Sequence, residues 1–129
     1  MTIVDSSVWI DYFNGKINRE TELLDQLMGQ EQLGIFDLIL TEVLQGFTGD
    51  RDFTLAKNAL NALTFYSTGN KSAAIRCAEN YRALRKKGIT IRKTIDVIIA
   101  TNCIELDHPL LHCDRDFDPF VAHLGLKVL

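Results

Sequence analysis

The sequence predicts an α/β fold, a single domain over residues 1–129 in which a central parallel sheet lies between helices as a three-layer α/β/α sandwich. Short apolar segments alternate with longer amphipathic segments, which is typical of a parallel sheet covered by helices on both faces. A chain of 129 residues suits one hydrophobic core, since single cores usually hold roughly 100–200 residues. The hydrophobic fraction of 47% and the charged fraction of 24% are those of a globular protein rather than a disordered one.

The elements of the first half follow from apolar spacing and from capping residues. Asp5, Ser6 and Ser7 offer capping side chains directly after an apolar segment, so a helix is expected to begin there. The segment 18–28 carries one apolar stripe at helical spacing, and Gly46 stands where a glycine commonly ends a helix. We expect strands at residues 2–4, 33–35 and 64–66, the last at an edge of the sheet, and helices at residues 8–13, 18–28, 38–44 and 53–63.

The second half is expected to begin with the longest helix, at residues 72–87. Three cations in its last turn suit the negative end of the helix dipole, and Gly88 closes it. Thr94 is expected to cap the next helix, which extends to Ile104. A strand at residues 109–113 then ends at Asp114, and a short helix at 117–123 and a final strand at 126–129 complete the prediction.

The cysteines and the hydropathy indicate the cellular compartment of the protein. There are three cysteines, Cys77, Cys103 and Cys113, and no C-x-x-C pair, so neither a disulfide framework nor a thiolate zinc site is expected. We expect buried thiols in a reducing, cytoplasmic compartment. No apolar run approaches the roughly 18–20 residues that span a bilayer, and residues 1–5 do not resemble a signal peptide. No membrane association is therefore expected.

Four carboxylates are predicted to meet at one edge of the sheet. Asp5 follows the first strand directly and Asp114 follows the fourth, and the carboxyl ends of parallel strands share an edge. Glu42 and Asp96 each interrupt an otherwise apolar helical run, where a carboxylate is costly unless something compensates it. No basic residue is matched to these acids in their local sequence. Like charges this close require a cation, and hard oxygen ligands suit Mg²⁺ or Mn²⁺.

Each acid also has a structural interpretation. An Asp after a strand commonly caps a helix, a Glu on a helix is commonly solvated, and Asp116 and Asp118 are compatible with a turn and a cap. The three histidines lack the spacing of metal ligands, so zinc is not indicated. A metal is therefore indicated by the four acids occurring together and not by any one of them.

The chain resembles the PIN-domain ribonucleases of the VapC toxin type. Four segments, in order over the whole chain, resemble the motifs of that family: 5–10 (DSSVWI), 41–46 (TEVLQG), 95–100 (IDVIIA) and 112–117 (HCDRDF). The resemblance implies an α/β/α fold and a Mg²⁺-dependent endoribonuclease, with Mn²⁺ as an alternative metal. The catalytic and metal-binding acids that it implies are Asp5, Glu42, Asp96 and Asp114, with Asp116 as an outer or alternate ligand and Ser7 as a supporting residue near the metal.

The resemblance also implies partners: an RNA substrate, a VapB-like antitoxin and a second copy of the chain in a homodimer. Such a toxin would belong to a type II toxin–antitoxin pair. The apolar side chains of Trp9, Phe13, Phe47 and Phe53 are candidates for the antitoxin contact, and they are equally compatible with a place in the core.

A basic segment precedes the third motif. The net charge of the chain is −3, yet residues 80–95 contain no acid and six of the fourteen basic residues. We expect this segment to guide the RNA backbone toward the metal, the alternative being a solvated helix end. The residues expected to act in this way are Arg82, Arg85, Lys86, Arg92 and Lys93.

A second function class stays open: a catalytically silent PIN fold that binds RNA or a protein partner. The presence of all four acids favours the nuclease. A haloacid-dehalogenase-type phosphatase would need a second Asp where Ser7 stands, and no G-x-x-x-x-G-K-[ST] segment is present for a P-loop.

Overall fold

A four-stranded parallel sheet forms the centre of the computed structural model, which describes residues 1–30 and 32–129. The strand order is β3-β2-β1-β4, with β1 at Thr2–Val4, β2 at Leu33–Phe36, β3 at Thr64–Tyr66 and β4 at Leu110–Leu111. The neighbouring pairs are all parallel, and β3 lies at an edge. The predicted fold class is therefore confirmed.

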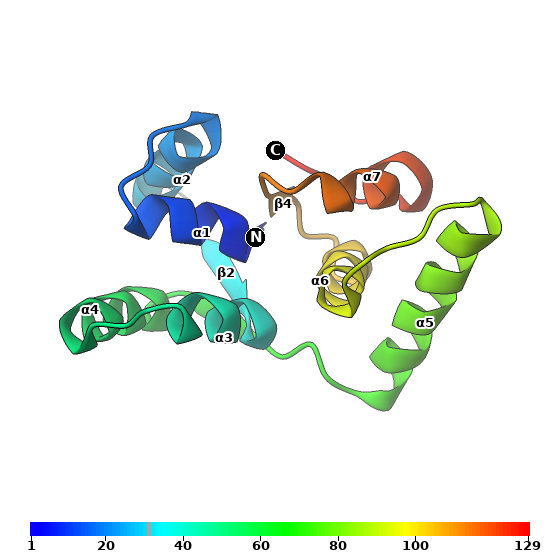
Figure 1. The fold of residues 1–129 in the computed structure, drawn as a ribbon, viewed down its shortest axis with the longest axis horizontal. Coiled ribbons are helices and arrows are strands. Elements are labelled where there is room, and N and C mark those ends of the chain that lie inside the picture. Colours follow the sequence, from blue (N-terminus) through cyan, green and yellow to red (C-terminus); the bar gives the residue numbers. More distant parts are fainter. Residues whose placement is uncertain (31) are drawn as a thin grey trace.

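Helices flank this sheet in two groups (Figure 1). In the first group α1 packs against α2 and α3, and α3 packs against α4. In the second group α5 packs against α6 and α7. The helices are α1 (Ser6–Phe13), α2 (Arg19–Gln30), α3 (Asp37–Gln45), α4 (Asp50–Asn61), α5 (Lys71–Lys86), α6 (Thr94–Glu105), the 3₁₀ turn η1 (Arg115–Phe117) and α7 (Asp118–Leu124). None of these described helices is long and apolar enough to cross a membrane.

The inner strand β1 determines where the first acid lies. Ile3 and Val4 are completely buried, as expected for a strand covered on both faces, and burying such a side chain contributes roughly 1.5–3 kcal/mol. The backbone N–H of Asp5 donates to the carbonyl of Leu111 at 2.9 Å, which extends the β1–β4 pairing by one residue. Asp5 is thereby fixed at the carboxyl end of β1, next to the end of β4.

The predicted elements need correction mainly near the C-terminus. The strand predicted at 109–113 is confined to Leu110–Leu111, and the strand predicted at 126–129 is reduced to a single parallel bridge between Leu110 and Val128. Leu126 in that segment is buried. Its apolar residue therefore indicates packing against the core and not a hydrogen-bonded strand. The helix predicted at 117–123 is η1 followed by α7.

Two single-residue predictions were wrong. Lys93 rather than Thr94 occupies the cap position of α6, without a side-chain capping bond. Cys113 is exposed, because it follows the short strand β4 instead of ending a longer one, whereas Cys77 and Cys103 are buried as predicted.

The aromatic side chains considered for a partner contact lie mainly within the fold. Trp9 is only 1% exposed, so it belongs to the core rather than to a free surface. Phe13, Phe47 and Phe53 are half-buried. The rings of Phe13 and Phe47 meet edge to face at 5.7 Å, which joins α1 to the segment after α3.

Gly34 in β2 is expected to be intolerant of a side chain. A Cβ atom built there lies 2.8 Å from the Tyr66 ring and 2.9 Å from Ile3 Cδ1, so Gly34→Ala should destabilise the protein by about 1–3 kcal/mol through overpacking. Gly29→Ala is the matched control, because nothing lies within 4 Å of a Cβ atom at this position in α2. The control should stabilise the helix by about 0.5–1 kcal/mol. Urea unfolding measures both changes, and equal effects would contradict the explanation by packing.

Candidate metal centre

Five acids are placed by the elements around the carboxyl edge of β1. Asp5 caps the N-terminus of α1, and Glu42 lies in α3, the helix that follows β2. Asp96 lies in the first turn of α6. Asp114 caps η1 and Asp116 lies within it. The parallel sheet thus brings together acids that are far apart in the sequence, as the strand order requires.

Three of the five form a compact group. Each of Asp96, Asp114 and Asp116 offers a carboxylate oxygen that lies within 4.8 Å of those of the other two. Asp116, which was expected as an outer or alternate ligand, is therefore one of the three closest acids. Asp5 and Glu42 are not members of this compact group. The field of Asp114 nevertheless raises the pKa of Asp5, after the larger effect of burial.

Two adjacent serines hold the two remaining acids. Ser7 Oγ donates to Asp5 Oδ2 at 2.6 Å, and the Ser7 backbone N–H donates to the same oxygen at 3.1 Å. Ser6 Oγ donates to Glu42 Oε1 at 3.1 Å. Ser7 was expected from the sequence and Ser6 was not. Ser6 could have been considered from the sequence, because it is the first residue of the helix that Asp5 caps.

The carboxylate of Asp96 carries the main evidence for a bound cation. Asp96 is 5% exposed, and its Oδ2 atom is buried with no hydrogen-bond partner among the described residues. Burial raises the pKa of Asp96 to about 6; Lys93 opposes this rise, and Asp114, Asp5 and Asp116 add to it. A buried, unpaired carboxylate oxygen next to other carboxylates is costly in a protein. A divalent cation with oxygen ligands, such as Mg²⁺ or Mn²⁺, fits this set of donors.

Two cations from a distant part of the sequence reach the same cluster, although no basic residue was matched to the acids in their local sequence. Arg92 Nη2 lies 3.0 Å from Asp116 Oδ2, and Lys93 Nζ lies 3.6 Å from Asp114 Oδ2. Both cations come from the predicted RNA-guiding set. The local sequence around each acid could not reveal these pairs, because they join residues about twenty positions apart.

His112 supports the loop that carries two of the acids. The backbone N–H of Asp114 donates to His112 Nδ1 at 3.2 Å, and the Asp116 N–H donates to Asp114 Oδ1 at 2.9 Å. The imidazole also packs on the Phe117 ring, with centroids 5.0 Å apart. The bond through Nδ1 requires that this nitrogen carry no proton. His112 therefore orients the acid-bearing loop and is not itself a member of the acidic group.

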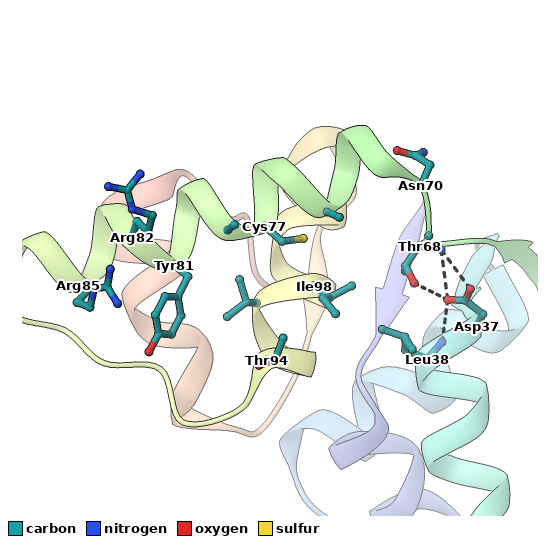
Figure 2. A pocket seen from close by; sticks show the side chains of 14 residues that line it. Asp37, Leu38, Thr68, Asn70, Cys77, Tyr81, Arg82, Arg85, Thr94 and Ile98 are labelled. Atoms are coloured by element: carbon teal, nitrogen blue, oxygen red, sulfur yellow. Dashed lines mark hydrogen bonds between the residues drawn. The ribbon is translucent and has the colours of Figure 1, made fainter.

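A groove of about 770 Å³ lies between α5, α6 and the start of α3 (Figure 2). Tyr81 and Arg85 lie toward one end of it, and Asp37 and Thr68 lie at the other, where Thr68 Oγ1 donates to Asp37 Oδ1 at 2.6 Å. Thr94, two residues before Asp96, also lines it. Arg82 and Arg85 of the predicted guiding set line this groove, and Lys86 lines a separate hollow on α5.

An acidic cluster at the carboxyl edge of a parallel sheet defines a candidate metal-dependent hydrolase of the α/β class. Comparison with known sequences identifies the family: the PIN domain matches residues 2–120. The chain therefore belongs to the PIN domain family.

Individual relatives cover nearly the whole chain. It is 28% identical to Ribonuclease VapC11 of Mycobacterium tuberculosis over 129 residues, which are 98% of this chain and 96% of the relative, and equally similar to a VapC ribonuclease of Mycobacterium bovis. Its fold is similar to a chain in the crystal structure of VapBC2 from Rickettsia felis bound to a promoter DNA fragment, with a TM-score of 0.78, 17% identity and coverage of 99% and 96%. It is also similar to a chain in FitAcB from Neisseria gonorrhoeae, with a TM-score of 0.74, 16% identity and coverage of 100% and 96%.

Neutralising Asp96 should stabilise the fold. Its pKa of about 6 lies above the ordinary value of 3.8, so the folded state retains a proton that the unfolded chain has already released. Stability is therefore lost as the pH rises through this interval. In EDTA, Asp96→Asn should be more stable than the unchanged protein by about 1–3 kcal/mol at pH 7.5, with the difference shrinking toward pH 4.

Urea unfolding at a series of pH values measures this difference. Glu79→Gln, at an exposed position on α5, controls for the loss of one negative charge. A deficit of Asp96→Asn at pH 7.5 would show that the ionised carboxylate contributes to folding rather than opposing it.

Proposed function

We propose that this protein is a Mg²⁺-dependent endoribonuclease and the toxin of a type II toxin–antitoxin pair. The observation that carries the proposal is the Oδ2 atom of Asp96, which is buried and has no hydrogen-bond partner among the described residues. A carboxylate oxygen of Asp96 lies within 4.8 Å of carboxylate oxygens of Asp114 and Asp116. Membership of the PIN domain family supports the same activity. Relatives over nearly the full length of the chain are named ribonucleases, which supports RNA as the substrate.

The chain's own residues divide the work of such a site. Asp96, Asp114 and Asp116 would hold the metal, with Asp5 and Glu42 at its border. When bound, Mg²⁺ supplies positive charge for the phosphate under attack and lowers the pKa of a bound water. Ser7 and Ser6 would orient Asp5 and Glu42 through the hydrogen bonds that their hydroxyl groups donate.

Glu42 has the properties of a proton acceptor in this reaction. Its pKa is raised by burial, while the Ser6 hydroxyl and Lys93 oppose the rise and Asp5 adds to it. A carboxylate with a raised pKa takes a proton from water more readily than an ordinary one. Water would attack the phosphorus in line with the departing 3′ oxygen, which leaves products with 5′-phosphate and 3′-hydroxyl ends. No covalent intermediate with Cys113 or another side chain is required.

The proposal includes two protein partners, a VapB-like antitoxin and a second copy of the chain. The solved structures of similar fold include VapBC2 from Rickettsia felis and a toxin–antitoxin complex from Klebsiella pneumoniae. Because their sequence identity is low, these structures support the fold, and the relatives named VapC support the pairing with an antitoxin. A cytoplasmic location agrees with the three free thiols.

The purified protein should cleave a mixed RNA pool with Mg²⁺ or Mn²⁺, and cleavage should stop in EDTA. Asp96→Asn should lower the rate at least about 100-fold, because the unpaired oxygen that would meet the metal is removed. Mapping the ends of the products checks the 5′-phosphate and 3′-hydroxyl groups. A folded protein that binds RNA yet stays inactive with either metal would favour the silent binding module instead.

The part of the guiding set on α5 should act on RNA affinity and on its salt dependence. Arg82→Ala with Arg85→Ala removes two cations that line the groove between α5 and α6. We expect weaker RNA binding and a salt slope reduced by about 0.7 for each phosphate that is no longer neutralised. Binding is measured on the Asp96→Asn background, in which cleavage is expected to be slow. Arg51→Ala with Lys57→Ala, exposed on α4, is the charge-matched control, and an equal effect of both pairs would contradict a specific guide.

A further inference from the structure

The segment between α5 and α6 is built to present two cations to the acidic cluster. Gly88 follows the end of α5 with a φ of 81°, a left-handed conformation that glycine adopts at little cost. Ile91 is 7% exposed and anchors the segment in the core. Arg92 and Lys93 come directly after this anchor and directly before α6, the helix of Asp96. Their backbone is thus held beside the acids, while their side chains stay exposed.

These cations contact the same carboxylates that form the compact group. Arg92 Nη2 donates to both oxygens of Asp116, at 3.0 and 3.3 Å, and Lys93 Nζ pairs with Asp114 Oδ2 at 3.6 Å. The charge of Lys93 is also felt at Glu42 and at Asp96, where it opposes the rise in pKa caused by burial. Lys93 therefore faces the cluster as a whole and not Asp114 alone.

The exposure of the cations decides whether such pairs are fixed or exchangeable. The side chains of Arg92 and Lys93 are 75% and 54% exposed, whereas those of Asp116 and Asp114 are 20% and 25% exposed. Ion pairs whose cation is solvated contribute little net stability, because water and salt screen them. Asp114 keeps a second partner when its pair breaks, because its Oδ1 accepts from the backbone N–H of Asp116 at 2.9 Å.

We propose that Arg92 and Lys93 are exchangeable internal counter-ions of this site. They balance the carboxylates of Asp114 and Asp116, a divalent cation displaces them from those oxygens, and the released side chains then contact the phosphodiester backbone of the RNA. The inference rests on the proposed function and assigns a role in it to Arg92 and Lys93. These two side chains lower the affinity of the site for the metal and raise its affinity for RNA.

The two effects separate this proposal from a structural role. If Arg92 and Lys93 merely arranged the acids as ligands, removing either would weaken metal binding. If they were ordinary surface cations, removing either would change metal binding no more than removing a distant charge. Of these three interpretations, only exchange predicts that metal affinity rises while RNA affinity falls.

The first test is a calorimetric titration of the purified protein with Mn²⁺. Lys93→Gln and Arg92→Gln should each bind Mn²⁺ about two- to fivefold more tightly than the unchanged chain, the size expected for removal of an exposed ion pair. Lys87→Gln is the matched control, because it removes one positive charge from the exposed end of α5, outside the ion pairs of the cluster. Its affinity should stay unchanged.

The second test is the rate of RNA cleavage at varied Mg²⁺ and varied RNA concentration. For Lys93→Gln the Mg²⁺ concentration at half-maximal rate should fall and the RNA concentration at half-maximal rate should rise. Circular dichroism and thermal melting show whether each variant is folded, and Arg92→Gln provides a second, independent substitution. Partial misfolding would lower the maximal rate and leave both concentrations unchanged, and a loosened site would raise both.

The outcomes distinguish the two proposals. An unchanged chain that gives no Mn²⁺ binding and no cleavage would overturn the proposed function and the exchange with it. A second outcome would overturn the exchange alone. In it the unchanged chain binds Mn²⁺ and cleaves RNA, but Lys93→Gln and Arg92→Gln bind Mn²⁺ as tightly as Lys87→Gln or more weakly.

Discussion

Electrostatic repulsion among carboxylates at one edge of a parallel sheet is the constraint on which this structure depends. Parallel pairing of β1 with β4 leaves Asp5 and Asp114 at the same edge, and α6 adds Asp96 from the side. The fold does not remove this repulsion by spacing the acids apart. It compensates the charges individually, with hydroxyl groups on Asp5 and Glu42 and cations on the more exposed acids.

Asp96 is the residue at which compensation is incomplete. The helix that carries it contributes to the core, with Val97, Ile99 and Ala100 buried. A helix of this kind is stable enough to carry one unfavourable carboxylate, because several buried side chains each contribute roughly 1.5–3 kcal/mol. The unfavourable carboxylate thereby lies at the place where a cation is useful.

The sequence contained enough information for the fold class and for the positions of the acids, because both follow from local patterns. Asp5 directly after a buried strand and Asp96 within an apolar helical run could be read from neighbouring residues alone. The pairing of Arg92 with Asp116, the bond from Ser6 to Glu42 and the shortness of β4 depend on how distant segments pack. Trp9 was ambiguous for the same reason, since an aromatic side chain on a short helix fits a core or a surface equally well.

The exposed thiol of Cys113 makes the site accessible to spectroscopy without any substitution. Of the three cysteines in the chain, Cys77 and Cys103 are buried, and Cys113 immediately precedes Asp114. Partial burial is the main cause that raises the pKa of the Cys113 thiol, so a maleimide label attaches more slowly than to an ordinary cysteine but still selectively. A fluorophore or nitroxide placed there would report on the surroundings of Asp114 directly, in an otherwise native chain.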